Sequence, residues 1–223
     1  MRFNDYIIII GTGIIVIAFL AIIYFSKKYT VPYYLKYFYW FPICGLLLSL
    51  NSILWTFFRL YIKLVFHLIQ DILNLISFII IFTFFLKYFK GTKFLAGLKL
   101  ICICISLAQL FLMIHLYKNE IRLPTQSLPA LIIIPMCFIY YYRLLKIKPT
   151  DNLFQSSLFW IITGTLLYTC TSFTVYNLYA FVPNSIFNGS LRSFIFSFAN
   201  ISAIVFYFLM VKAYACLKHP QNF

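Results

Sequence analysis

Seven apolar runs, each close to the length that crosses a bilayer, constrain this chain more than any other feature. A transmembrane helix needs about 20 mostly apolar residues, and runs such as IIIIGTGIIVIAFLAIIYF are apolar on all sides. Within hydrocarbon every backbone amide must be paired inside the protein, so only helices or a closed barrel cross it. Barrel strands would alternate in polarity over about ten residues, which these runs do not. The sequence therefore predicts an all-α, polytopic membrane protein.

Short links separate the runs, so residues 1–223 are predicted to form a single bundle of seven transmembrane helices. The predicted spans are 6–25, 37–58, 64–85, 95–116, 128–145, 158–180 and 194–215. Composition agrees, because 64% of the residues are hydrophobic and 10% are charged, against about 45 to 50% and about 25% in soluble domains. The first run is expected to remain as a helix, since no small-residue cleavage site follows it.

The distribution of Lys and Arg predicts the orientation of the bundle. Twelve of them lie at one side of the predicted spans and six at the other. The positive-inside rule then places the N-terminus outside and the C-terminus in the cytoplasm, which requires an odd number of helices. The net charge of +14 lies mostly between the apolar runs, which favours the lipid bilayer as partner and argues against nucleic acid.

The sequence contains no pattern that points to a metal, a cofactor or an enzyme. All six cysteines lie in apolar runs, without a C-x-x-C pair or a histidine at ligand spacing. They are expected to be small buried hydrophobic residues. A general-base role for His67 with Asp71 ranks last among the interpretations, because no nucleophile, metal triad or phosphate loop accompanies the pair.

The stretch HLIQDILN, residues 67–74, places polar side chains inside the third apolar run. His67, Asp71 and Asn74 are spaced i, i+4, i+7 and share one helix face, with Gln70 beside them. Asp71 is the only acidic residue within a predicted span. Facing it to lipid would cost roughly 2.5 to 3.5 kcal/mol on insertion scales, so the stripe is predicted to face protein or water.

Under the predicted topology, polar residues of several other spans lie at the same outer level. We therefore predict an outward-facing polar cavity. Its candidate ligand-binding residues are His67, Gln70, Asp71, Asn74, Asn51, Gln109, Asn177 and Asn200.

The alternative to a cavity is a hydrogen-bonded seam between helices, where each amide or hydroxyl contributes about 0.6 kcal/mol. Taken singly, the amides favour this seam. His67 and Asp71 together favour a functional site, because ionisable residues inside a membrane are usually functional. Three states of Asp71 remain open: protonated, paired with His67, or facing a cation.

Two residues predict details of helix packing. Gly164, between Thr163 and Thr165, predicts a close contact of the 158–180 helix with a neighbour. Pro42 predicts a kink near the start of the 37–58 helix.

The stretches HLIQDILNLISFIIIF, LFWIITGTLLYTCTSF and ANISAIVFYFLMVKAYA resemble a group of bacterial seven-helix integral membrane proteins. Some members occur alone, and others form the membrane sensor region of histidine kinases. The likeness rests mainly on Phe159, Trp160, Gly164, Tyr168 and Asn200. It implies a signal-input module in the bacterial cytoplasmic membrane. Only CLKHPQNF follows the seventh run, so output is expected to need a separate cytoplasmic signalling partner.

Two functions therefore stand as expectations. The first is a stand-alone sensor that binds a small ligand, a lipid or a proton from outside, with a response that depends on Asp71 and His67. The alternative is a small-solute transporter or channel. Transporters commonly contain inverted repeats and broken helices, and the two halves of this sequence show no convincing repeat.

Overall fold

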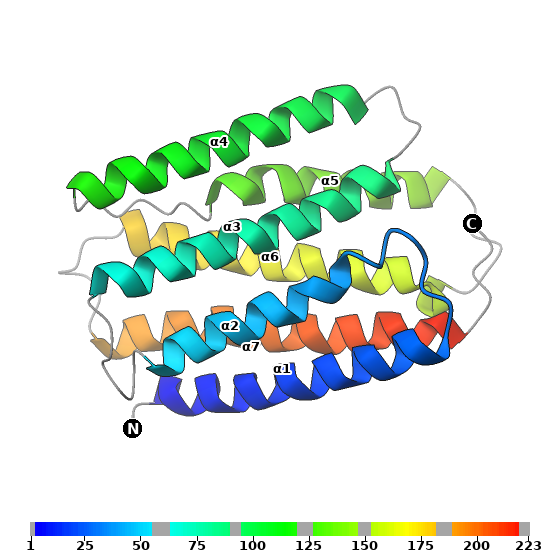
Figure 1. The fold of residues 1–223 in the computed structure, drawn as a ribbon, viewed down its shortest axis with the longest axis horizontal. Coiled ribbons are helices and arrows are strands. Elements are labelled where there is room, and N and C mark those ends of the chain that lie inside the picture. Colours follow the sequence, from blue (N-terminus) through cyan, green and yellow to red (C-terminus); the bar gives the residue numbers. More distant parts are fainter. Residues whose placement is uncertain are drawn as a thin grey trace.

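A computed structural model of the chain shows a bundle of helices in which successive helices run in alternate directions (Figure 1). It describes residues 3–54, 63–89, 95–119, 127–146, 153–181 and 189–218, and no β-strand occurs in these ranges. The α-helices are α1 (Phe3–Lys28), α2 (Phe41–Ile53), α3 (Lys63–Tyr88), α4 (Leu95–Asn119), α5 (Ser127–Lys146), α6 (Ser157–Phe181) and α7 (Gly189–Ala215). Three short 3-10 helices are η1 (Phe38–Trp40), η3 (Leu153–Gln155) and η4 (Cys216–Lys218).

Five helices in the described part of the chain are long and apolar enough to cross a membrane. Their apolar segments are Tyr6–Lys28, Leu68–Tyr88, Leu128–Lys146, Ser157–Leu178 and Ser197–Lys218. Two shorter apolar helices, Phe38–Ile53 and Ala96–Phe111, accompany them. The prediction of a helical membrane protein with several spans is therefore confirmed.

The observed helices depart from the predicted spans mainly at their ends. Helix α1 continues past residue 25 to Lys28, because lysine side chains at a helix end reach the polar interface and let the helix extend beyond its apolar run. At the second run, α2 begins at Phe41 and Pro42 lies in its first turn. A proline there loses no intrahelical hydrogen bond, so Pro42 starts the α-helix instead of kinking it. Residues 55–58 of that span lie outside the described residues.

An aromatic core joins η1, α2, α3 and α7. The ring of Phe38 lies 4.9 Å from that of Phe84 and 6.4 Å from that of Phe206, and all three side chains are fully buried. Phe41 packs on Phe206 with ring centroids 5.0 Å apart. Helix α7 makes its most extensive contacts with α6 and α1. Packing of this kind replaces the hydrophobic driving force that lipid-embedded helices lack.

Two glycines let helices approach α7 closely. A Cβ on Gly164 of α6 would lie 2.8 Å from Phe206 Cδ2 and 3.2 Å from Leu209 Cβ. A Cβ on Gly45 of α2 would overlap the hydroxyl group of Tyr207. The predicted close contact at Gly164 is confirmed, and Gly45 provides a second one.

Tyr214 of α7 anchors the connection between α1 and α2. Its hydroxyl donates to the Leu35 carbonyl oxygen at 3.0 Å, and both residues are fully buried. The Leu35 carbonyl oxygen also accepts from the Phe38 N–H at 3.0 Å. Tyr214→Phe is therefore expected to lower the free energy of unfolding by about 1 kcal/mol, the net contribution of one buried hydrogen bond. Denaturant unfolding in detergent measures the change. Tyr142→Phe, on an exposed face of α5, is the control, and an equal effect of both variants would contradict a role for the bond.

Helix α4 lies at the edge of the bundle (Figure 1). It packs on the bundle through a narrow stripe of side chains along one of its faces. Among its described side chains, Leu98, Cys102 and Gln109 are buried and Ile105 is half-buried. These positions repeat every three or four residues and share one helix face. Most of the remaining described side chains of α4 are exposed. Gln109 is the only amide in the stripe and therefore a polar point of contact between α4 and the bundle.

Candidate functional site

A cavity of about 70 Å³ lies inside the bundle, between α2, α3, α4, α5 and α6. Its polar side chains come from three helices: Asn74, Ser77, Gln109, Tyr168, Thr169 and Ser172. Its apolar wall is formed by Phe41, Phe78, Ile81, Pro129, Ala130, Ile133 and Phe173. No residue that lines this cavity is charged. The site therefore combines hydrogen-bonding groups with an uncharged surface.

Helical periodicity accounts for this lining. On α3, Asn74, Ser77, Phe78 and Ile81 are spaced i, i+3, i+4, i+7, so one face of the helix points to the cavity. On α6, Tyr168 and Thr169 lie one turn before Ser172 and Phe173. Helix α4 contributes Gln109 alone.

Two amides at the cavity have unsatisfied hydrogen-bonding atoms. Within the described part of the chain, neither Asn74 Nδ2, a donor, nor Gln109 Oε1, an acceptor, has a hydrogen-bond partner, and both atoms are buried. The whole side chain of Gln109 is 1% exposed. Leaving such a group buried and unpaired costs about 1 to 3 kcal/mol. A molecule that supplies both an acceptor and a donor would remove this cost at both amides.

The Ser77 hydroxyl already uses its proton within its own helix. Its Oγ donates to the Leu73 carbonyl oxygen at 2.9 Å, as serines in membrane helices commonly do. It therefore offers only lone pairs to the cavity. The unsatisfied capacity of the site is concentrated in Asn74 and Gln109.

Two of the predicted site residues make hydrogen bonds away from the cavity. Asn51 Nδ2 donates to the Phe66 carbonyl oxygen at 3.2 Å and joins α2 to α3. Asn177 Nδ2 donates to the Phe173 carbonyl oxygen at 2.7 Å, within α6. Neither asparagine lines the cavity. The Asn51 bond is of the interhelical kind that the sequence left as the alternative, whereas the Asn177 bond stays within one helix.

Three further predicted residues, Asp71, Asn200 and Gln70, do not line this cavity. Asp71 and Asn200 have interaction partners in the structure, and neither lines the cavity. Gln70 is half-buried on α3 and also lies outside the lining. The side chain of His67 is outside the described residues. Of the eight candidates, the structure thus places Asn74 and Gln109 together at one cavity.

Sequence reasoning did not assign Tyr168 or Thr169 to the site. A signal was present, because Thr165, Thr169 and Ser172 repeat every three or four residues along the sixth apolar run. Such a repeat places hydroxyl groups on one helix face. Thr165 is fully buried and its Oγ1 has no hydrogen-bond partner among the described residues.

No protein-family model, curated protein or solved structure matches the chain. The resemblance to membrane sensor regions of histidine kinases therefore stays an expectation from the sequence.

Proposed function

We propose that the protein is a stand-alone seven-helix membrane sensor whose bundle binds a small polar ligand between α3, α4 and α6. The proposal places the N-terminus outside, the C-terminus in the cytoplasm of a bacterial cell, and output in a separate cytoplasmic partner. The observation that carries it is the pair of unpartnered amide atoms, Asn74 Nδ2 and Gln109 Oε1, at one cavity. A bundle that needed these amides only for packing would pair them with protein groups.

The cavity favours a neutral ligand of a few heavy atoms. Its lining contains no charge that would compensate an ion, and an ion without a partner in such surroundings is strongly disfavoured. Its volume of about 70 Å³ excludes large molecules. Asn74 Nδ2 requires an acceptor and Gln109 Oε1 requires a donor. Short alcohols, amides and ureas carry both groups.

The position of Gln109 suggests how binding changes the bundle. Gln109 is the polar member of the stripe that holds α4, whereas Asn74 belongs to α3. A ligand that bridges the two amides favours the arrangement in which α4 is docked. Without the ligand, the unpaired amides weaken that arrangement. Binding then shifts the population between two positions of α4, and the start of α4, near Lys99, carries the change to the proposed cytoplasmic side.

A thermal-shift screen of the purified protein tests the ligand site. The panel contains short alcohols, amides and ureas, with sodium acetate and ammonium chloride as charged counterparts. We expect a neutral compound to raise the unfolding temperature of the wild type and to have at least tenfold lower apparent affinity for Gln109→Met, on the order of the 1.4 kcal/mol that one hydrogen bond contributes.

Two outcomes would contradict the proposal. The first is stabilisation by the charged compounds alone. The second is equal stabilisation of wild type and Gln109→Met by every compound that binds. Uptake of the labelled hit into proteoliposomes, abolished by Gln109→Met, would favour the transporter alternative, because polar cavities between helices also serve as substrate sites.

A further inference from the structure

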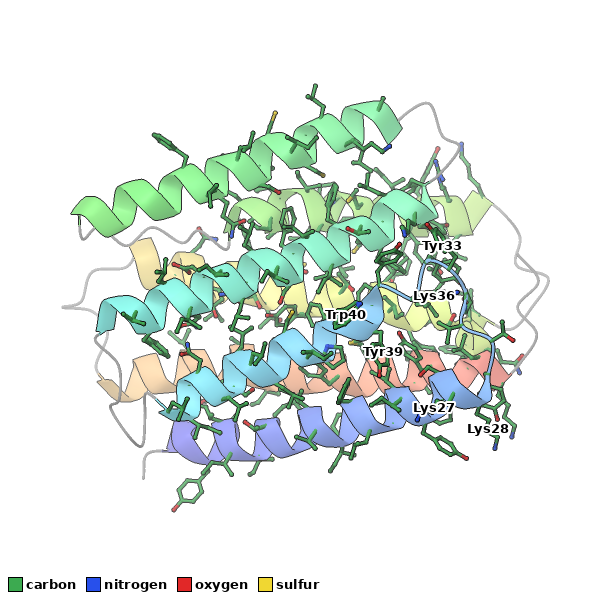
Figure 2. All side chains as sticks on the ribbon, viewed as in Figure 1. Lys27, Lys28, Tyr33, Lys36, Tyr39 and Trp40 are labelled. Atoms are coloured by element: carbon green, nitrogen blue, oxygen red, sulfur yellow. The ribbon has the colours of Figure 1, made fainter. Side chains whose placement is uncertain are left out.

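A second and larger cavity, of about 360 Å³, lies at the end of the bundle where α1 ends. It is formed by the end of α1, the α1–α2 connection and α7, and its lining includes Tyr29, Thr30, Lys36, Tyr39 and Tyr214. Lys36 and Thr30 are exposed, so the cavity is reached from the surface. Figure 2 shows Lys36 and Tyr39 at this end of the bundle, with Lys27 and Lys28 on the neighbouring end of α1.

Positive charge gathers at the same end. Nine of the twelve basic residues in the described ranges lie there: Lys27, Lys28, Lys36, Lys87, Lys99, Arg143, Lys146, Lys212 and Lys218. The other three, Lys63, Lys118 and Arg192, belong to helix ends at the opposite end of the bundle. Of the two acidic residues in the described ranges, Asp5 belongs to the start of α1, at the opposite end of the bundle, and Asp71 lies within α3. The positive charge of this end is therefore not compensated by described carboxylates, and an anion is the ligand that it attracts.

Lys36 is the cation that lines the cavity. Other lysines at this end lie over aromatic rings. Lys87 Nζ is 3.0 Å from the centroid of the Tyr37 ring and 4.0 Å from that of Tyr33. The ammonium group of Lys36 makes no comparable ring contact within the described part of the chain, so its charge is directed to the cavity or to solvent.

The remaining donors of the cavity suit a phosphate group. The Tyr214 hydroxyl donates to the Leu35 carbonyl oxygen at 3.0 Å, and the Ser26 hydroxyl, also in the lining, donates to the Ile23 carbonyl oxygen at 2.9 Å. The hydroxyls of Tyr29, Thr30 and Tyr39 and the ammonium group of Lys36 are the side-chain donors left beside them. Several donors around one cation match the several oxygens of a phosphate.

The surroundings of the cavity point to a lipid as the source of that phosphate. Tyr24, Tyr33 and Trp40 near it are 58%, 59% and 57% exposed, as aromatic residues at a membrane interface are. Further along α1, Ile17 and Leu20 are 68% and 59% exposed, as lipid-facing side chains are. We propose that this cavity binds the phosphodiester headgroup of an anionic glycerophospholipid.

Lipid titration of the full chain in detergent tests this proposal, with the unfolding temperature and native mass spectrometry as readouts. Phosphatidylglycerol is compared with phosphatidylcholine of the same acyl chains and with soluble glycerol 3-phosphate. We expect phosphatidylglycerol to bind and stabilise the protein more than phosphatidylcholine does. Lys36→Gln should weaken its binding about fivefold, the typical contribution of one basic residue near an anionic lipid surface.

Lys146→Gln is the matched control, because it removes the same charge at the same end but outside the cavity. It should weaken binding by clearly less than Lys36→Gln does, because it removes only the general attraction of the surface. Equal effects of the two substitutions would overturn the proposal in favour of general surface attraction. Glycerol 3-phosphate that displaces phosphatidylglycerol at comparable concentration would also overturn it, in favour of a soluble phosphate ester. Tyr39→Phe, which removes one donor, gives the same test if Lys36→Gln does not fold.

Discussion

Replacing Gly164 by alanine is expected to lower the free energy of unfolding by about 1 to 3 kcal/mol, as overpacking does in other tightly packed cores. The added Cβ would lie 2.8 Å from Phe206 Cδ2 and 3.2 Å from Leu209 Cβ. Phe206 is fully buried and stacks on Tyr168 at 5.5 Å between ring centroids, so its ring is not free to turn away. Leu209 Cβ moves only with the backbone of α7. Helices α6 and α7 therefore have to separate.

Gly13→Ala provides the control for this prediction. A Cβ on Gly13 of α1 meets no atom within 4 Å, and alanine is the better helix former by about 1 kcal/mol. We expect this variant to be as stable as the wild type or more stable. Denaturant unfolding of both variants in the same detergent measures the difference. A Gly164→Ala variant as stable as Gly13→Ala would show that α6 and α7 are not packed as closely as the structure places them.

Two identical substitutions of asparagine by leucine are expected to change stability in opposite directions. Asn51→Leu removes a buried hydrogen bond between α2 and α3 and should lower the free energy of unfolding by about 1 kcal/mol. Asn74→Leu removes a buried donor without a partner among the described residues and should raise it by about 1 kcal/mol, because an unsatisfied polar group is replaced by an apolar one. Both measurements are made without added ligand.

The opposite signs separate a ligand site from a structural seam. Both residues are asparagines within apolar helices, so differences in size and helix propensity are similar for the two substitutions. If Asn74→Leu destabilised the protein as much as Asn51→Leu, the Asn74 amide would be part of the hydrogen-bonded seam. The proposed site would then lose one of its two binding groups.

The helices could be predicted from the sequence because lipid leaves few alternatives. A run of about 20 apolar residues without charges has no other stable form in a bilayer. Helix ends depend instead on local contacts. Lys28 extends α1 beyond its apolar run, and the η1 turn delays the start of α2 to Phe41. Apolar composition carries no information about either feature.

The candidate site could be predicted only in part. The sequence indicates which polar residues lie within the apolar runs, including Asn74 and Gln109. Their partners, however, depend on how each helix is rotated and which helices are neighbours. Asn51 and Gln109 look alike in the sequence, yet Asn51 meets the Phe66 carbonyl and Gln109 faces the cavity. Lys36 was counted only as a topology signal. Its cavity lies where the α1–α2 connection is held to α7 by the Tyr214–Leu35 hydrogen bond, with Leu35 fully buried.

A fluorophore on Cys104 tests the central claim most directly, because that claim joins ligand binding to a movement of α4. Cys104 lies on α4 and is the only exposed cysteine of the six. Labelling it in a Cys170→Ala background, which removes the one half-buried cysteine, gives a single reporter.

The labelled protein is titrated with the neutral compound that raises its unfolding temperature. The same titration is made with the labelled Gln109→Met variant. We expect a saturable change in emission with the same midpoint as the thermal shift. In Gln109→Met, the ligand concentration at the midpoint should be at least tenfold higher. Stabilisation by the compound without any change in emission would contradict the proposed sensor function, because the ligand would then bind without moving α4.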